Sequence, residues 1–194
     1  ATNLAGELQH LLDRSLSQGS FIFRGQTTAA DTLAPDVFQA AKKHLADVAE
    51  QVFDRYNEAP VRAETALAER FLRIGNLKAV TAEIDPLGLV RISGGTPHIQ
   101  SEHKALISIR DYVDRNGTVE GKRLINTFTD APFGWSQDTL RYLVAALLVA
   151  GEIKLKVSGR EVTVNGQQAI EALRTNKAFR PVGVALRGER PSME

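Results

Sequence analysis

Apolar residues recur at helical spacing along most of this chain, and the first clear stripe lies at its start. The spacing predicts an amphipathic helix over residues 3–18, with Asn3 as the N-cap and Gly19 ending it. The stripe consists of Leu4, Leu8, Leu11, Leu12 and Leu16. A short β-prone run follows at residues 20–24, and residues 25–34 are interpreted as a loop.

A second apolar stripe predicts a long helix over residues 35–57, opened by Pro35 and broken by Pro60. Its members are Val37, Ala41, Leu45, Val48, Val52 and Tyr56. A further helix is expected over residues 63–74. Glycine and proline then surround a short apolar strand in residues 85–97, and this stretch is interpreted as a linker.

The pattern after residue 95 is more regular and predicts three helices, a β-hairpin and a last short helix. Ser101, Thr118 and Ser136 are placed to cap the three helices. The hairpin turns at Ser158-Gly159, where glycine supplies a positive φ. The expected ranges are 102–115, 119–129 and 137–150 for the helices, 152–164 for the hairpin and 167–175 for the last helix.

This order of elements is that of a winged helix, a relative of the helix-turn-helix. The expected fold class is therefore α+β and mostly helical. An N-terminal helical region with a short strand is expected over residues 1–95, followed by a winged-helix-like domain over 96–187. Residues 188–194 are expected to form a flexible tail.

Composition narrows the functional classes. The 194 residues include no cysteine, which excludes disulfides, thiolate metal sites and cysteine nucleophiles, and favours a reducing compartment. No apolar run reaches the roughly 18 residues that span a bilayer, so a cytoplasmic protein without a membrane partner is expected. Residues 1–100 hold 10 Lys/Arg against 12 Asp/Glu, and residues 101–194 hold 14 against 11. The mildly basic second half permits nucleic acid as a partner.

The motifs of common catalytic centres are missing from the sequence. It contains no GxxxxGK[ST] phosphate loop, no HExxH pair and no GxSxG elbow. His98 and His103 lie five residues apart beside Glu102, a spacing that exposed polar histidines explain better than a metal site does. We therefore expect no catalytic residue, no cofactor and no metal in this chain.

Two features remain as candidate contact surfaces. Phe133 and Trp135 precede the third helix of the domain, where packing onto the core is favoured over a binding surface. Arg141 on that helix and Lys154, Lys156 and Arg160 on the hairpin are candidate phosphate contacts. Protein contacts are an equally open use of the same elements.

Several segments together resemble one family. They are FIFRG at residues 21–25, DPLGLV at 85–90 and APFGWSQDTLRYLVAALLVAGEI at 131–153. In this combination they are similar to a stretch of the large P-loop protein of BREX and Pgl phage-defence systems, the BrxC/PglY family.

The resemblance implies a fragment from outside the ATPase core of such a protein, in a prokaryotic defence system. ATP would be the cofactor of the parent protein, and other defence-system proteins would be partners. The first hypothesis is a non-catalytic interaction module that mediates protein contacts, with duplex DNA as a further candidate partner through Arg141, Lys154, Lys156 and Arg160. The alternative is a stand-alone winged-helix DNA-binding transcriptional regulator.

Overall fold

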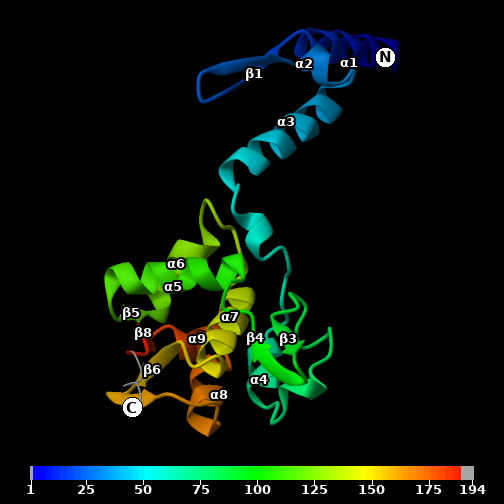
Figure 1. Ribbon diagram of the computed structural model, residues 1–194. Coiled ribbons are helices and arrows are strands. Elements are labelled where there is room, and N and C mark those ends of the chain that lie inside the picture. The colour runs from blue at the N-terminus through cyan, green and yellow to red at the C-terminus, as the bar shows by residue number, and fades with distance from the viewer. Residues whose placement is uncertain (1, 189–194) are drawn as a thin grey trace. The chain divides into compact units, whose positions relative to one another are not determined.

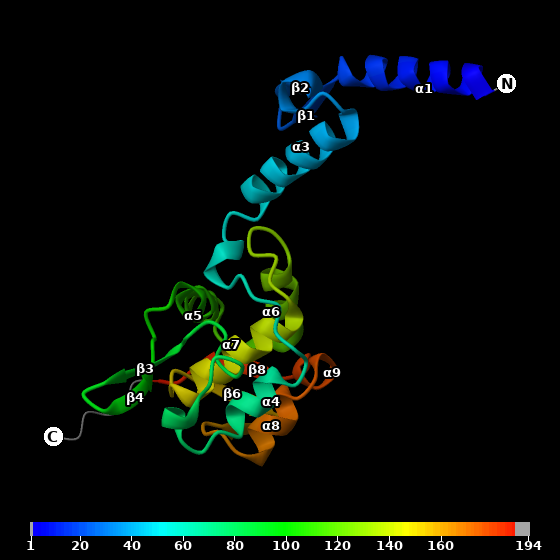
Figure 2. The ribbon, with the colours of Figure 1, turned by 90° about the vertical axis from the view of Figure 1, so that its right-hand side faces the viewer.

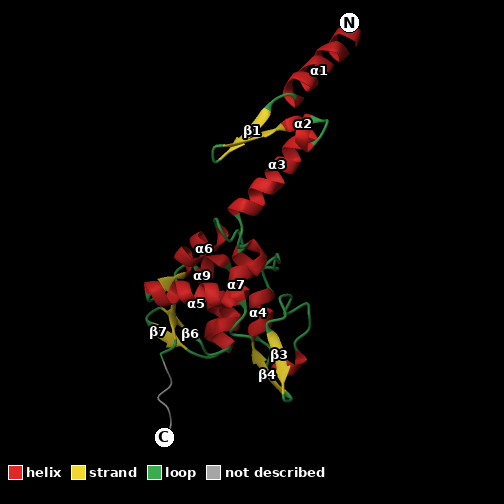
Figure 3. Cartoon of the chain, turned by 45° about the horizontal axis from the view of Figure 1, so that its top comes forward, coloured by secondary structure: helices red, strands yellow, loops and turns green. Residues whose placement is uncertain are grey.

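The computed structural model describes residues 2–188, and the chain divides into two compact units, Ala1–Asp54 and Arg55–Glu194 (Figure 1). Helices make up 50% of the structure and strands 16%. The strands occur in short hairpins and one small sheet among the helices (Figure 3). The expected fold class, α+β and mostly helical, is confirmed.

The first unit consists of a hairpin with one helix before it and two helices after it. Its elements are α1 (Thr2–Ser17), β1 (Ser20–Phe23), β2 (Gln26–Ala29), α2 (Ala30–Leu33) and α3 (Val37–Val52). The helix predicted over 3–18 is confirmed within one residue. The loop predicted over 25–34 is wrong, because these residues form β2 and α2. The helix predicted over 35–57 is shorter at both ends. It begins after Asp36, which caps it by accepting from the backbone N–H of Gln39 at 2.8 Å, and it ends at Val52.

The core of this unit is small. Its fully buried residues within the described range are Ala30, Ala34 and Ala40, with Phe21 and Leu33 packed against them. The leucine stripe of α1 does not join this core, and its five side chains are 54–71% exposed. The predicted amphipathic helix is confirmed, but its apolar face is exposed to solvent.

The second unit begins before the predicted boundary. Its first elements are η1 (Tyr56–Glu58), α4 (Leu67–Leu72), η2 (Leu77–Ala79), β3 (Val90–Ser93) and β4 (Thr96–Ile99). Buried residues of this stretch, among them Leu67, Phe71 and Leu89, belong to the same core cluster as the later helices. The linker expected over 85–97 is instead the β3–β4 hairpin, and the division at residue 95 moves to residues 54 and 55. The glycines and prolines there make a tight turn within a packed unit.

The remaining elements follow the predicted order. They are α5 (Lys104–Asn116), β5 (Val119–Glu120), α6 (Gly121–Thr129), α7 (Gln137–Val149), β6 (Ile153–Val157), β7 (Arg160–Val162), α8 (Gln167–Leu173), α9 (Asn176–Phe179) and β8 (Gly183–Leu186). Ser136 caps α7 as predicted, accepting from the N–H of Thr139 at 3.0 Å. The other two caps differ, because α5 begins after His103 and α6 after Glu120.

Strand β8 was not predicted, and it completes the sheet. The strand order is β5-β8-β6-β7 with every pair antiparallel, so β8 lies between β5 and the β6–β7 hairpin. The tail expected over 188–194 lies, from residue 189 onward, outside the described residues.

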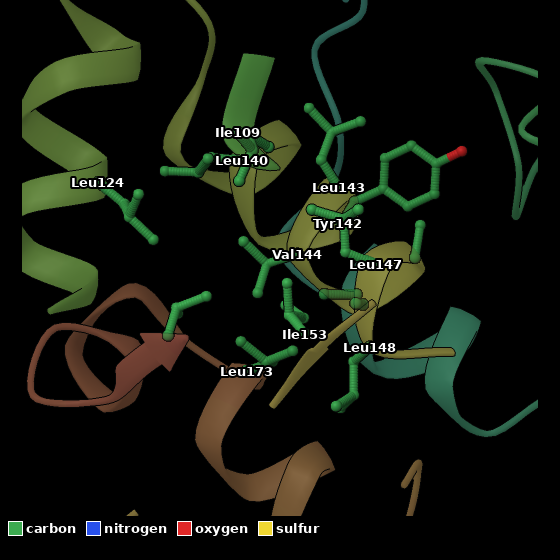
Figure 4. Close-up of a cluster of buried hydrophobic side chains, with 14 of the residues drawn as sticks. Ile109, Leu124, Leu140, Tyr142, Leu143, Val144, Leu147, Leu148, Ile153 and Leu173 are labelled. Atoms are coloured by element: carbon green, nitrogen blue, oxygen red, sulfur yellow. The ribbon is translucent and has the colours of Figure 1, made fainter. Parts of the chain in front are cut away.

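Helix α7 occupies the centre of the second unit, as the turned view in Figure 2 shows. Figure 4 shows its Leu140 and Val144 among side chains of the surrounding elements. Those neighbours include Ile109 of α5, Leu124 of α6, Ile153 of β6 and Leu173 of α8. A helix with apolar residues all round is buried all round, and this packing explains the run Leu143–Leu148.

Gly121, the first residue of α6, marks a point where two backbones meet. A Cβ atom at this position would overlap the carbonyl oxygen of Phe179. The N–H of Gly121 also donates to the carbonyl of Val182 at 2.8 Å. The start of α6 therefore depends on the absence of a side chain here.

We expect Gly121→Ala to lower the free energy of unfolding by about 3 kcal/mol, because the methyl group must displace backbone rather than a flexible side chain. Gly75→Ala is the matched control. Gly75 is exposed, is not among the glycines with positive φ, and has open space where the Cβ would stand, so the change should stay within about 0.5 kcal/mol. Urea unfolding followed by circular dichroism measures both, and equal midpoints for the two variants would contradict the close approach.

Candidate functional site: the central helix and the wing

Helix α7 holds the place of the helix that reads the major groove in DNA-binding members of this architecture. Every residue from Thr139 to Leu148 is buried. Residues 61–90 cover one side of the helix. Thr139 donates its hydroxyl to the carbonyl of Val61 at 2.8 Å, and its Oγ1 accepts from the N–H of Ala63 at 3.2 Å. The body of the helix, from Thr139 to Leu148, therefore has no free face for DNA.

The same covering segment is fixed to α7 by Tyr142. Its ring meets Phe71 of α4 edge-on at 5.4 Å between centroids. Its hydroxyl donates to the buried carboxylate of Asp85, which also accepts from the N–H groups of Leu89 and Val90 at 2.8 Å each. Burial and the Asp85 hydrogen bond raise the pKa of Tyr142 well above its usual range, so the phenol stays a donor. Asp85 thus joins the segment before β3 to the central helix.

Among the predicted site residues, Arg141 differs most from its expected position. It is 0% exposed, whereas a phosphate contact requires an accessible side chain. Its guanidinium donates to Asn176 Oδ1 at 2.7 Å, to the Leu173 carbonyl at 2.5 Å and to the Thr65 carbonyl at 3.0 Å. It also pairs with Asp138. The prediction that Arg141 contacts phosphate is wrong for this structure, because its donors are used inside the unit.

The three hairpin residues split between the two faces of the sheet. Side chains alternate along a strand, and directly paired residues share a face. Lys156 pairs with Glu161, so Lys154, Lys156 and Glu161 lie on one face. Arg160 pairs with Val157 and lies on the other face. The β6–β7 hairpin is the wing of this architecture. The cations predicted on it therefore do not form a single surface.

The face with the two lysines carries nearly balanced charge. Lys154 forms an ion pair with Glu161 at 2.8 Å, and the hydrogen bond from Lys154 lowers the pKa of Glu161. Lys156 donates to Thr118 Oγ1 at 3.2 Å. Asp114 lines the same shallow hollow as both lysines. A phosphate approaching this face would meet carboxylates as well as ammonium groups.

Arg160 instead lines a groove of about 690 Å³ on the opposite side of the hairpin. The groove lies between the hairpin, α8, α9 and the residues just before β8. Its lining residues are Val157, Ser158, Arg160, Gln168, Glu171, Ala172, Ala178, Pro181 and Val182. The sequence pattern does not predict this groove, because one of its walls consists of α9 and the residues that follow it.

Phe133 and Trp135 pack into the core, as the sequence interpretation favoured. They are 7% and 1% exposed. The indole of Trp135 stacks on Phe128 at 5.2 Å between ring centroids. The guanidinium carbon of Arg55 lies over the ring of Phe133, 4.5 Å from its centroid. These aromatic side chains join the loop before α7 to α6.

His103 has a structural role at the start of a helix. His103 Nδ1 accepts from the N–H of Ala105 at 3.3 Å at the start of α5, and burial lowers its pKa. Among residues 2–188, no group of three or more histidine, aspartate and glutamate side chains is placed to hold a metal ion. Within the same residues, no helix is both long and apolar enough to cross a membrane.

A comparison with protein-family models decides the family. Residues 92–187 match the model described as the BREX ATP-binding protein BrxC winged helix-turn-helix domain. These residues belong to the BrxC winged-helix family. The resemblance found in the sequence is thereby confirmed for this part of the chain, and the match is to a winged-helix domain with no catalytic domain beside it.

No curated protein and no solved structure matches the chain. The BrxC winged-helix match begins inside β3, whereas the core of the second unit also includes residues from 59 onward. The packed unit is therefore longer at its N-terminal side than the matched domain.

We expect Arg141→Ala to destabilise the protein by about 3–5 kcal/mol, because it leaves Asp138 and two carbonyl groups without their donor. Arg141→Lys should recover only part of this loss, since one ammonium group cannot reach Thr65, α8 and α9 together. Arg160→Ala serves as the control for an exposed arginine, with an expected change within about 0.5 kcal/mol. Thermal and urea unfolding measure the stability of all three variants. An Arg141→Ala variant as stable as Arg160→Ala would contradict the buried position of Arg141.

Proposed function

We propose that this chain is a non-catalytic contact module of a BREX-type P-loop ATPase, which binds protein partners of the defence system. The observation that carries the proposal is the leucine stripe of α1, whose five side chains are more than half exposed. A contiguous apolar stripe of this kind is typical of a protein interaction surface. Among the described residues, the buried core of the first unit consists of three alanines. The leucine side chains of α1 therefore find little apolar surface within the chain to pack against.

The buried state of α7 supports protein contacts over sequence-specific DNA reading. A helix that reads bases must place polar side chains in the major groove. Thr139, Arg141 and Tyr142, the polar residues along the body of α7, all have partners within the second unit. Releasing them would require residues 61–90 to leave the core.

The apolar character of the stripe gives a direct test. At 100° per residue, Leu8 lies at the centre of the stripe and His10 on the opposite side of α1. In a pull-down of the chain co-expressed with the other proteins of its own defence locus, Leu8→Glu should reduce the bound partner at least tenfold, since a charge would be buried in the contact. His10→Glu adds the same group outside the stripe and should leave binding unchanged.

Equal partner recovery by the parent chain and Leu8→Glu would contradict the proposal. Both substitutions are at exposed positions, so circular dichroism should give the same helix content for each variant. A loss shared by Leu8→Glu and His10→Glu would also count against the stripe, because it would trace to α1 as a whole.

Direct duplex DNA binding is the second candidate, and the pair of lysines on one face of β6 favours it. The carboxylates beside them weaken it, and Arg160 points away. We expect a labelled duplex to bind more weakly than about 10 μM at physiological salt. We also expect the triple variant Lys154→Ala, Lys156→Ala, Arg160→Ala to change little. Tight binding in fluorescence anisotropy that weakens steeply with salt and fails in the triple variant would establish the wing as a DNA contact.

A further inference from the structure

The leucines of α1 follow the seven-residue pattern of a helix that pairs with another helix. With the positions of this heptad written a to g, Leu8 lies at a, and Leu4 and Leu11 lie at d. Leu12 and Leu16 widen the stripe on one side. Side chains at a and d form the seam between two paired helices. The exposed stripe therefore has the form of one half of such a seam.

Two side chains of opposite charge lie along the other edge of the stripe. Glu7 and Arg14 both occupy position g. Seven residues are about two turns, or roughly 10 Å along the axis, so the two charges are well separated within one helix. Both are exposed, and within residues 2–188 neither forms an ion pair. The other ionisable residues of α1, His10 and Asp13, lie at c and f on the far side of the helix.

We propose that the α1 stripe pairs with the same stripe of a second copy of this chain, with the two helices antiparallel. In an antiparallel pair the two g edges face each other. Glu7 of one copy then lies opposite Arg14 of the other, and the twofold symmetry forms the same pair a second time. In a parallel pair each g edge would face the apolar e edge, and both charges would lie beside Leu12 without a partner. The charge pattern is complementary to itself in the antiparallel orientation.

The small core of the first unit gives a reason for such pairing. Within the described residues, that core consists of three alanines with Phe21 and Leu33 packed against them. Units of about 50 residues with so little buried apolar surface generally need a disulfide, a metal or association with another chain. The chain contains no cysteine. Pairing through α1 buries apolar surface from both copies at once.

This inference rests on the protein-contact role proposed above and names a partner for the same stripe. A second copy is itself a protein of the defence system, and its binding is measured on the isolated chain, whereas the pull-down measures other proteins. A monomeric chain that still needs Leu8 to recover another protein would overturn the pairing and leave the contact role intact. A dimer that needs Leu8, with no Leu8-dependent recovery of another protein, would support the pairing and contradict a contact with other proteins.

Charge reversal at position g tests the pairing, with sedimentation equilibrium of the full chain at about 50 mM salt, where surface charges are weakly screened. We expect the parent chain to dimerise with a dissociation constant of about 10 μM. Glu7→Arg places arginine opposite arginine in both pairs, and Arg14→Glu places glutamate opposite glutamate. Each variant alone should weaken dimerisation about tenfold. An equimolar mixture of the two variants should regain the parent affinity, because each arginine of one chain then faces a glutamate of the other.

Asp13→Arg is the matched control, since it makes the same change of charge at position f on the far side of α1. It should leave the dissociation constant within about twofold. Circular dichroism checks that each variant keeps the helix content of the parent chain.

Four results would overturn the proposal. They are a parent chain that stays monomeric at about 100 μM, dimerisation that survives Leu8→Glu, single charge reversals that dimerise as the parent does, and a mixture of the two reversals that dimerises no better than either one alone.

Discussion

The burial of α7 on all sides governs the arrangement of the second unit. Core helices can be apolar all round only if other elements cover every face. Here α5, α6, the sheet and α8 cover part of the circumference, and residues 61–90 cover the rest. Arg141 brings the positive charge of this helix into the core, and it is tolerated because Asp138 and three oxygen acceptors surround the guanidinium. The cover on α7 is thus fixed by polar contacts as well as by packing.

In this chain, that arrangement separates the fold from the function that the fold suggests. A winged-helix order of elements suggests DNA binding, yet the fold alone does not determine the partner. In this chain, the element that would read bases has become the centre of the core. The surfaces that remain open are the leucine stripe of α1, the two faces of the hairpin and the groove beside it. Of these, the leucine stripe of α1 is the surface that we propose for contacts with other proteins.

Much of the fold could be predicted from the sequence, because helical periodicity is local. The stripe of α1, the helices α5 to α7 and the turn at Ser158-Gly159 all follow from neighbours within a few residues. The packing of residues 59–90 onto the same core could not be predicted, since glycine and proline mark a turn whether it lies in a linker or in a packed hairpin. Strand β8 was missed because its partners, β5 and β6, are distant in the sequence.

The candidate site was harder to predict, because it depends on orientation. Arg141 lies one turn after Gln137 and Asp138, which are partly exposed, and only the contacts with Thr65 and Asn176 show that its side chain turns inward. For Arg160, strand alternation alone would have separated it from Lys156 once the register of the hairpin was known. The groove itself required α9 and the residues that follow it, which the periodicity did not reveal.

The position of β8 also constrains the order in which the protein forms during synthesis. Strand β5 and the β6–β7 hairpin are made first, but they do not pair with each other. The sheet stays in two parts until residues 183–186 have left the ribosome and inserted between them. The nascent chain therefore exposes unpaired strand edges on both sides of the gap for much of its synthesis, a state in which association with other chains competes with folding. If synthesis stopped before residue 183, the β6–β7 hairpin would lack β8, the strand that joins it to the rest of the unit.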